Sequence, residues 1–216
     1  ADGTPPKTEP KLVAYRLCQD PKLLAVPAFL SAAEVDHLLG LLDKPAKDEP
    51  PPSANGAAGA AGTEGFWQEE SQTLRSLEPA ETPEVEAVES RLCATSGLSL
   101  NSLARLRIVR PGVKLGLCNR GCGPKSAYIC LSEQDEVFFP RLGIRLVLKR
   151  GDLAMWPNVD WETGRAVEDV RTMRVHLQPQ GSGTAAVGVD AFFHDNPVRE
   201  QQSQRRFVHE WEAVTV

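Results

Sequence analysis

The sequence is poor in several features on which whole classes of proteins depend. It has only four histidines in 216 residues, and no lysine follows Lys149. Basic residues are outnumbered by acidic ones, 24 to 29, which gives a formal net charge of -5. Nucleic acid and anionic membranes are therefore not the expected partners, and no apolar run is long enough to form a transmembrane segment.

The first ten residues contain neither the apolar segment of a signal peptide nor the arginines of a transit peptide. The composition suits a cytosolic or an organellar interior, mitochondrion and plastid included.

Cysteine is also scarce, and the motifs of several enzyme classes are missing. The five cysteines form no pair of closely spaced pairs, which favours free or buried thiols. For Cys118 and Cys122 a local disulfide or a metal half-site stays open as an alternative. No glycine-rich loop is followed by Lys and Ser or Thr, and Gly181-Ser182-Gly183 is not the centre of a nucleophile elbow.

The segments that are present predict one α+β domain. Ser31 and Glu34 have the spacing of a capping box, and Val35 and Leu38 begin the apolar face of the helix that follows. A second helix is predicted over 83–93, with Pro83 in its first turn. Short apolar segments between turn residues predict about seven strands after these helices. They are placed at 103–109, 126–131, 138–140, 144–148, 153–156, 173–177 and 185–193.

The chain divides into a central domain and flanking segments. Residues 1–26 are interpreted as an N-terminal arm and leading strand, 27–198 as the domain, and 199–216 as a C-terminal docking tail. Within the domain, 44–65 is a Pro-, Gly- and Ala-rich insert that cannot bury a core, so we expect a flexible loop.

The order and spacing of short motifs over about residues 27–193 resemble the prolyl 4-hydroxylase-like iron(II)/2-oxoglutarate dioxygenases. The matching segments are Phe29-Leu30-Ser31 with its helix, Val88 to Leu92, Leu106 to Gly112, Ala127 to Ser132, Glu136 to Pro140 and Lys149 to Trp156. The resemblance implies a double-stranded β-helix (jelly-roll or cupin-like) core with N-terminal flanking helices. For an active member it also implies iron(II), 2-oxoglutarate and ascorbate, and hydroxylation of prolyl or related residues.

The metal-ligand positions that the resemblance implies are altered here. Such enzymes hold iron with two histidines and one carboxylate. The first histidine and the carboxylate correspond to Cys118 and Arg120, six and eight residues after Gly112. A guanidinium has no lone pair to offer and stays protonated. His176 corresponds to the distal histidine, and we interpret it either as a surviving ligand or, preferably, as a strand-end histidine with one nitrogen satisfied.

The expected anchor for 2-oxoglutarate is a cation about ten residues after the distal histidine. Residues 181–186 contain none. Arg174 would share a strand face with His176, so a rewired anchor is an alternative. The other histidines form no cluster in the sequence; they are His37, His194 and His209.

We therefore predict a non-catalytic domain that needs no cofactor. It would act as a structural or interaction subunit with protein partners, in a larger assembly. Two alternatives stay open. One is an active dioxygenase with His176 and Cys118 as metal ligands. The other is a small-anion binder that uses the vestigial pocket around Cys118, Arg120 and His176.

Overall fold

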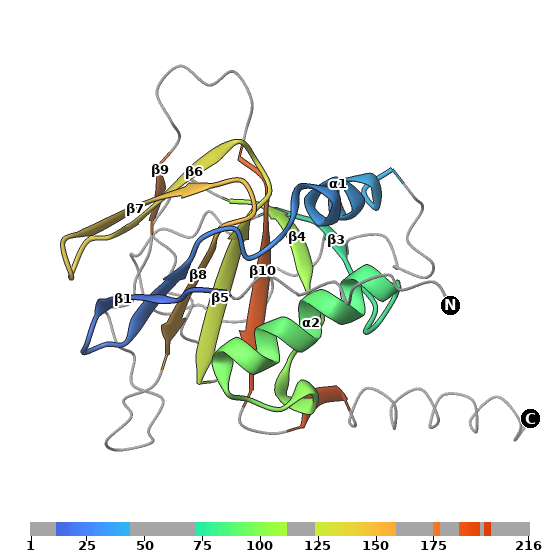
Figure 1. Ribbon diagram of the computed structural model, residues 1–216, viewed down its shortest axis with the longest axis horizontal. Coiled ribbons are helices and arrows are strands. Elements are labelled where there is room, and N and C mark those ends of the chain that lie inside the picture. The colour runs from blue at the N-terminus through green and yellow to red at the C-terminus, as the bar shows by residue number, and fades with distance from the viewer. Residues whose placement is uncertain are drawn as a thin grey trace, which may run out of the picture.

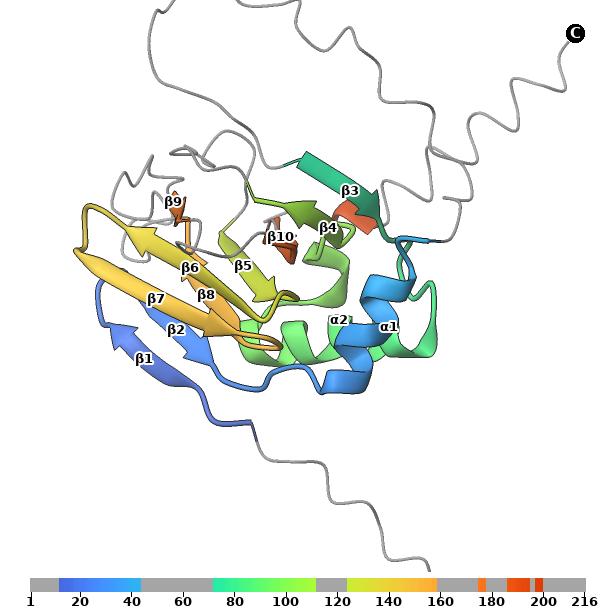
Figure 2. The ribbon, with the colours of Figure 1, turned by 90° about the horizontal axis from the view of Figure 1, so that it is seen from above.

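The structure is a computed structural model, and it describes residues 12–43, 72–111, 124–158, 175–177, 186–194 and 197–199. Its helices and strands form three layers (Figures 1 and 2). In chain order they are β1 (Tyr15–Cys18), β2 (Leu23–Val26), α1 (Ala32–Gly40), β3 (Gln72–Ser76), α2 (Pro83–Ser96), a 3-10 helix (Leu100–Ser102), β4 (Arg107–Arg110), β5 (Lys125–Cys130), β6 (Gln134–Phe139), β7 (Ile144–Lys149), β8 (Leu153–Pro157), β9 (Val175–Leu177) and β10 (Gly188–Phe193).

Two antiparallel sheets make up most of the described domain. The larger has seven strands in the order β1-β2-β8-β5-β10-β4-β3, and the smaller has three in the order β7-β6-β9. The helices lie on one face of the large sheet, and the small sheet lies on the other (Figure 2). This arrangement confirms the predicted α+β class with a jelly-roll-like core.

The central strands of the large sheet are buried on both faces, because each face is covered by another layer. On β5, Ala127 and Ile129 pack in the cluster that contains the helices. The alternate residues Tyr128 and Cys130 pack in the cluster that contains the small sheet. A strand covered on both faces appears in sequence as a continuous apolar run, as 126–131 does.

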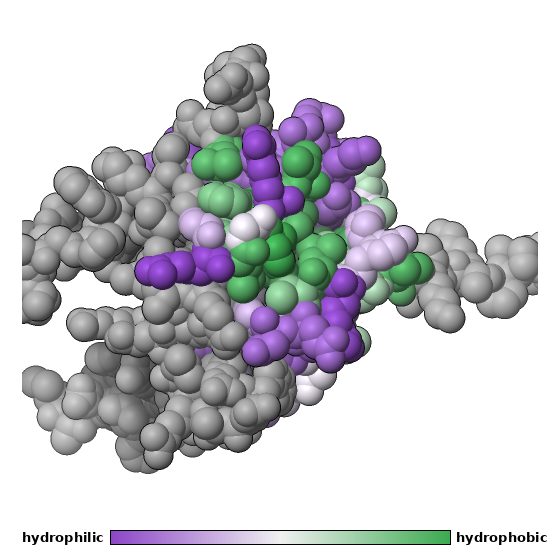
Figure 3. Space-filling view, turned by 90° about the vertical axis from the view of Figure 1, so that its left-hand side faces the viewer, coloured by the Kyte–Doolittle hydropathy of each residue, from purple (hydrophilic) through white to green (hydrophobic). Residues whose placement is uncertain are grey.

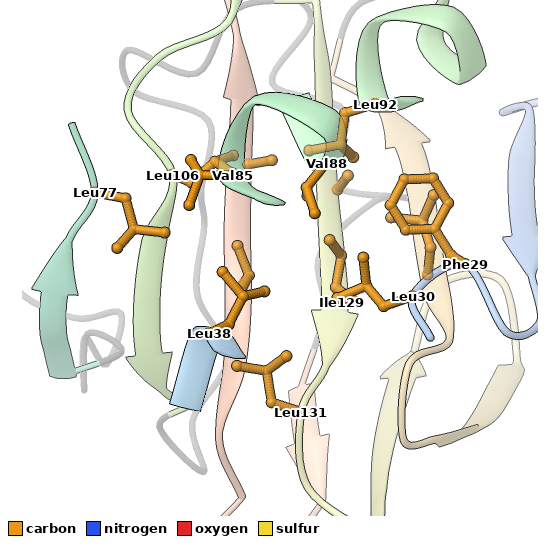
Figure 4. Packing of buried hydrophobic residues seen from close by; sticks show 14 of the residues in the cluster. Phe29, Leu30, Leu38, Leu77, Val85, Val88, Leu92, Leu106, Ile129 and Leu131 are labelled. Carbon is orange, nitrogen blue, oxygen red and sulfur yellow. The ribbon is translucent and has the colours of Figure 1, made fainter. Parts of the chain in front are cut away.

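The helical layer is held by aliphatic packing. Val88 and Leu92 of α2 and Leu38 of α1 project toward Ile129 on the sheet, and all four side chains are fully buried (Figure 4). Burying such a side chain stabilises the fold by about 1.5–3 kcal/mol relative to exposing it. No helix in the described part of the chain is long and apolar enough to cross a membrane.

The helix ends follow from local chemistry. The capping box is confirmed: the Glu34 N–H donates to the Ser31 hydroxyl at 3.3 Å, and the Ser31 N–H donates to the Glu34 carboxylate at 2.8 Å. α2 begins after Thr82 and ends three residues later than predicted, at Ser96. It continues because the first residue able to end it is Gly97, which takes a left-handed φ of 71°.

The strand predictions were wrong in several places, including the single leading strand, which is two strands, and the last strand, which begins at Gly188 rather than at residue 185. Strand β4 begins at Arg107 rather than at residue 103, because Leu103 and Leu106 cross the helical core as irregular chain. Strand β3 was not predicted. Strand β6 begins at Gln134 rather than at residue 138, since its first half is polar.

The flanking segments lie mostly outside the described residues. The insert 44–65 and residues 200–216 of the predicted tail are among them. Arg199, the first residue of that tail, donates to the carboxylate of Glu89 on α2 at 2.6 and 3.1 Å and to the carbonyl of Leu103 at 2.9 Å. Among the described cysteines, Cys18, Cys93 and Cys130 are free thiols, as expected.

Candidate functional site

A polar cluster lies in the otherwise apolar interior between the two sheets. The Tyr128 hydroxyl donates to Oδ2 of Asp135 at 2.5 Å, and Nδ1 of His176 lies 3.0 Å from the same oxygen. The rings of Tyr128 and His176 meet edge to face, with centroids 4.6 Å apart. The three residues come from β5, β6 and β9, so this cluster joins the large sheet to the small one.

The backbone places each member of this Tyr128–Asp135–His176 cluster. Tyr128 points toward the small sheet because strand residues alternate between faces. His176 lies opposite Val137 in the pairing of β9 with β6. The ring of Tyr128 occupies the space over Gly188 of β10, where an added Cβ would lie 2.3 Å from ring atoms. Gly188 is therefore required by the position of the tyrosine ring.

The hydrogen bonds set the charge state of the cluster. Burial by itself would raise the pKa of Asp135, but hydrogen bonds and charge from His176, with hydrogen bonds from Tyr128 and the Glu136 N–H, hold this pKa below its ordinary value. Burial, followed by the charge of Asp135, raises the pKa of Tyr128 far above its ordinary value. Asp135 is therefore an acceptor, and Tyr128 remains a protonated donor.

A second carboxylate faces the same interior. Asp190 of β10 lies opposite Tyr128 in the strand pairing, is 2% exposed, and contributes to the raised pKa of the tyrosine. Nη2 of Arg107 on β4 lies 3.9 Å from this carboxylate. The same guanidinium lies over the Phe192 ring, 4.6 Å from its centroid.

These residues do not fit an iron centre of the kind that the resemblance implies. Within the described ranges, no three His, Cys, Asp or Glu side chains are grouped so that they could hold a metal. Asp135 uses Oδ2 for Tyr128 and His176, while Oδ1 accepts the Glu136 N–H at 2.7 Å. The carboxylate that holds the imidazole is thus engaged by three donors or partners from the protein itself.

Nor do the described residues supply the expected anchor for 2-oxoglutarate. The stretch about ten residues after His176 continues into β10, and 186–193 contains no lysine or arginine. The charged residue of this stretch that faces the interior is Asp190, which would repel a carboxylate ligand.

The sequence singled out one member of the cluster and missed the others. His176 is buried and its Nδ1 lies 3.0 Å from Asp135, an arrangement that a surviving ligand and a strand-end histidine would share. Cys118, Arg120 and Arg174 lie outside the described residues. Of the other histidines, His37 lies 3.0 Å from the Thr82 hydroxyl, His194 donates its backbone N–H to Ser102, and His209 lies outside the described residues.

Tyr128, Asp135 and Asp190 gave little signal in the sequence. Tyr128 was part of an apolar strand, and Asp135 lay with Glu133 and Gln134 between two predicted strands. Alternation along β6 could have found Asp135, because it shares a strand face with Val137 and Phe139, which are buried in the cluster between the sheets.

The two facing sheets, with helices outside the larger one, define the double-stranded β-helix fold of the prolyl 4-hydroxylase type. Two solved structures of the viral collagen prolyl hydroxylase from Paramecium Bursaria Chlorella virus-1 are similar to this chain. A truncated form has a TM-score of 0.53 and 14% identity, over 89% of this chain and 96% of that one. A 2OG complex has a TM-score of 0.52 and 12% identity, over 79% and 94%.

The resemblance inferred from the motifs is thereby confirmed at the level of the fold. No protein-family model matches the chain, and no curated protein does.

Proposed function

We propose that this chain is a non-catalytic prolyl 4-hydroxylase-like domain that serves as a structural or interaction subunit of a larger protein assembly. The observation that carries the proposal is the Tyr128–Asp135–His176 cluster, in which one carboxylate oxygen serves both partners and no third possible metal ligand is grouped with them among the described residues. In that cluster the carboxylate of Asp135 binds both the imidazole and the tyrosine hydroxyl, which is the pattern of a buried polar network.

The sequence supports the same proposal independently. The position that corresponds to the ligand carboxylate holds Arg120, and the position of the first histidine holds Cys118. A permanently charged guanidinium would repel iron(II) and cannot coordinate it. Loss of ligands at separate positions is difficult to reconcile with a working facial triad.

The charge of the described interior argues against a bound dicarboxylate or another small anion. Asp135 and Asp190 are both buried there, and the low pKa of Asp135 keeps it ionised at neutral pH. Arg107 lies 3.9 Å from Asp190 and His176 lies 3.0 Å from Asp135, so these groups already face carboxylates, with which an entering anion would have to compete. We therefore do not favour the small-anion binder.

The proposal is tested by metal and cosubstrate binding to the whole chain. After anaerobic reconstitution with iron(II) and gel filtration, we expect metal far below one equivalent by elemental analysis. We also expect no heat of binding with 2-oxoglutarate and no succinate. Stoichiometric iron that is lost in His176→Ala would overturn the proposal, because it would place a working metal centre at this imidazole.

A further inference from the structure

The large sheet has an open edge at β1 that exposes apolar side chains. Among the described strands β1 pairs only with β2, so no described strand covers the backbone groups on its other side. Tyr15 is 54% exposed, Leu17 39%, and Val13 just before the strand 54%. Unpaired edges of this kind are the usual sites at which an extended segment adds as a further strand.

The neighbouring small sheet extends this surface. The β1–β2 and β6–β7 hairpins point to the same side of the molecule in both ribbon views (Figures 1 and 2). Cys18 and Leu142, near their two turns, pack against one apolar cluster. The view from that side shows apolar residues at the centre of the face with polar residues around them (Figure 3).

The charges around this edge have mostly one sign. Arg16 and Lys22 of the β1–β2 hairpin and Arg141 of the β6–β7 turn are exposed, and within the described residues no carboxylate lies within ion-pair distance of them. The β1–β2 hairpin has one acidic residue, Asp20. This edge is therefore basic on a chain whose net charge is -5.

We propose that the β1 edge binds an extended segment of a partner protein that alternates apolar and acidic residues and adds as a strand beside β1. This inference rests on the proposed function and names the interaction surface. The apolar residues of the partner would contact Tyr15 and Leu17, and its carboxylates would face Arg16 and Lys22. The charge argues against a second copy of the chain, because antiparallel pairing of two β1 strands brings these cations toward their equivalents.

The test uses two fluorescent peptides of about ten residues, one alternating valine with glutamate and the other alternating valine with lysine. We expect saturable binding of the glutamate peptide by fluorescence anisotropy and affinity at least about tenfold weaker for the lysine peptide. Arg16→Glu should reverse this preference. Arg110→Glu is the matched control, because Arg110 is an exposed arginine on β4 and not on this edge.

Amide hydrogen exchange then reports whether the edge itself is used. The β1 amides that face away from β2 should exchange rapidly in the free monomer and be slowed by the glutamate peptide. Equal affinity for both peptides, no binding of either, or an unchanged preference in Arg16→Glu would overturn the proposal.

Two further outcomes would also overturn it. If the β1 amides are protected in a dimer without peptide, the occupant is a second copy. If the β1 amides are protected in the peptide-free monomer, the occupant of the edge is another segment of this chain. None of these results affects the iron and 2-oxoglutarate measurements, so failure of this inference is distinguishable from failure of the proposed function.

Discussion

The carboxylate of Asp135 holds Nδ1 of His176 at 3.0 Å in the interior between the two sheets. In a metal site such a bond orients the imidazole, whose other nitrogen then binds the ion. Here the same carboxylate oxygen also accepts the Tyr128 hydroxyl, and no third ligand is grouped with the pair among the described residues. The pair therefore joins β9 and β6 to β5 as a structural contact.

The first prediction concerns the strength of this contact. Replacing Asp135 by Asn removes the charge and leaves Tyr128 and His176 with a weaker, neutral partner in a buried position. We expect Asp135→Asn to lower the free energy of unfolding by about 2–4 kcal/mol, measured by urea denaturation. Glu133→Gln is the control, since Glu133 is an exposed carboxylate just before β6 and should change stability by less than about 0.5 kcal/mol. If the two substitutions lower the free energy of unfolding equally, Asp135 does not have the structural role inferred here.

The second prediction is a dependence on pH. The folded state lowers the pKa of Asp135 from its ordinary value of 3.8. Its contribution is therefore fully present above that value and is lost as the pH falls through the lower folded pKa. The stability difference between the native chain and Asp135→Asn should therefore be smaller at pH 3 than at pH 5.

Glu34 also has a lowered pKa, so acid destabilisation of the native chain cannot be assigned to Asp135 by itself. The pH dependence of the free energy of unfolding is therefore also measured for Glu34→Gln and for the double variant Glu34→Gln with Asp135→Asn. This comparison separates the contribution of Asp135 from that of Glu34. If the stability difference caused by Asp135→Asn is the same at pH 3 as at pH 5, the pKa of Asp135 is not lowered by folding.

The third prediction concerns Gly188. An added methyl group would meet the Tyr128 ring at 2.3 Å, and the ring cannot move without breaking its hydrogen bond to Asp135. Gly188→Ala should cost about 1–3 kcal/mol of stability. Gly40→Ala, at the end of α1, is the matched control because nothing lies within 4 Å of the added carbon. In the background of Tyr128→Leu, most of the cost of Gly188→Ala should disappear.

Much of the fold could be predicted from the sequence because its signals are local. The helix after Ser31 depends on one capping box, and the helix that begins at Pro83 depends on Thr82 and Gly97 at its ends. The strands β5, β8 and β10 are apolar because the layers on both sides cover them, and β7 alternates because one of its faces is exposed. The polar strand start at Gln134 and the missed strand β3 depend on neighbours that are distant in sequence.

The candidate site was predictable only in part for the same reason. His176 could be identified because the family resemblance matches it to the distal histidine. Asp135 becomes important only when β6 pairs with β9, since that pairing brings together residues that are 41 positions apart. Asp190 is likewise recognised only through its place opposite Tyr128. The charged residues that face the interior between the sheets are set by the pairing of distant strands, and no local sequence motif predicts that pairing.

The fourth prediction concerns the first residue of the C-terminal segment. Arg199 donates two hydrogen bonds to Glu89, whose side chain is 1% exposed, and a third to the carbonyl of Leu103. Because removing Arg199 leaves a buried carboxylate on α2 without its cation, Arg199→Ala should lower stability by about 3–5 kcal/mol. Arg199→Met with Glu89→Leu removes both charges and should restore much of the loss. The exposed pair of Arg105 and Glu78 is the control, for which Arg105→Ala should cost less than about 1 kcal/mol. If Arg199→Ala costs no more than this control, the segment is not anchored to α2 by that ion pair.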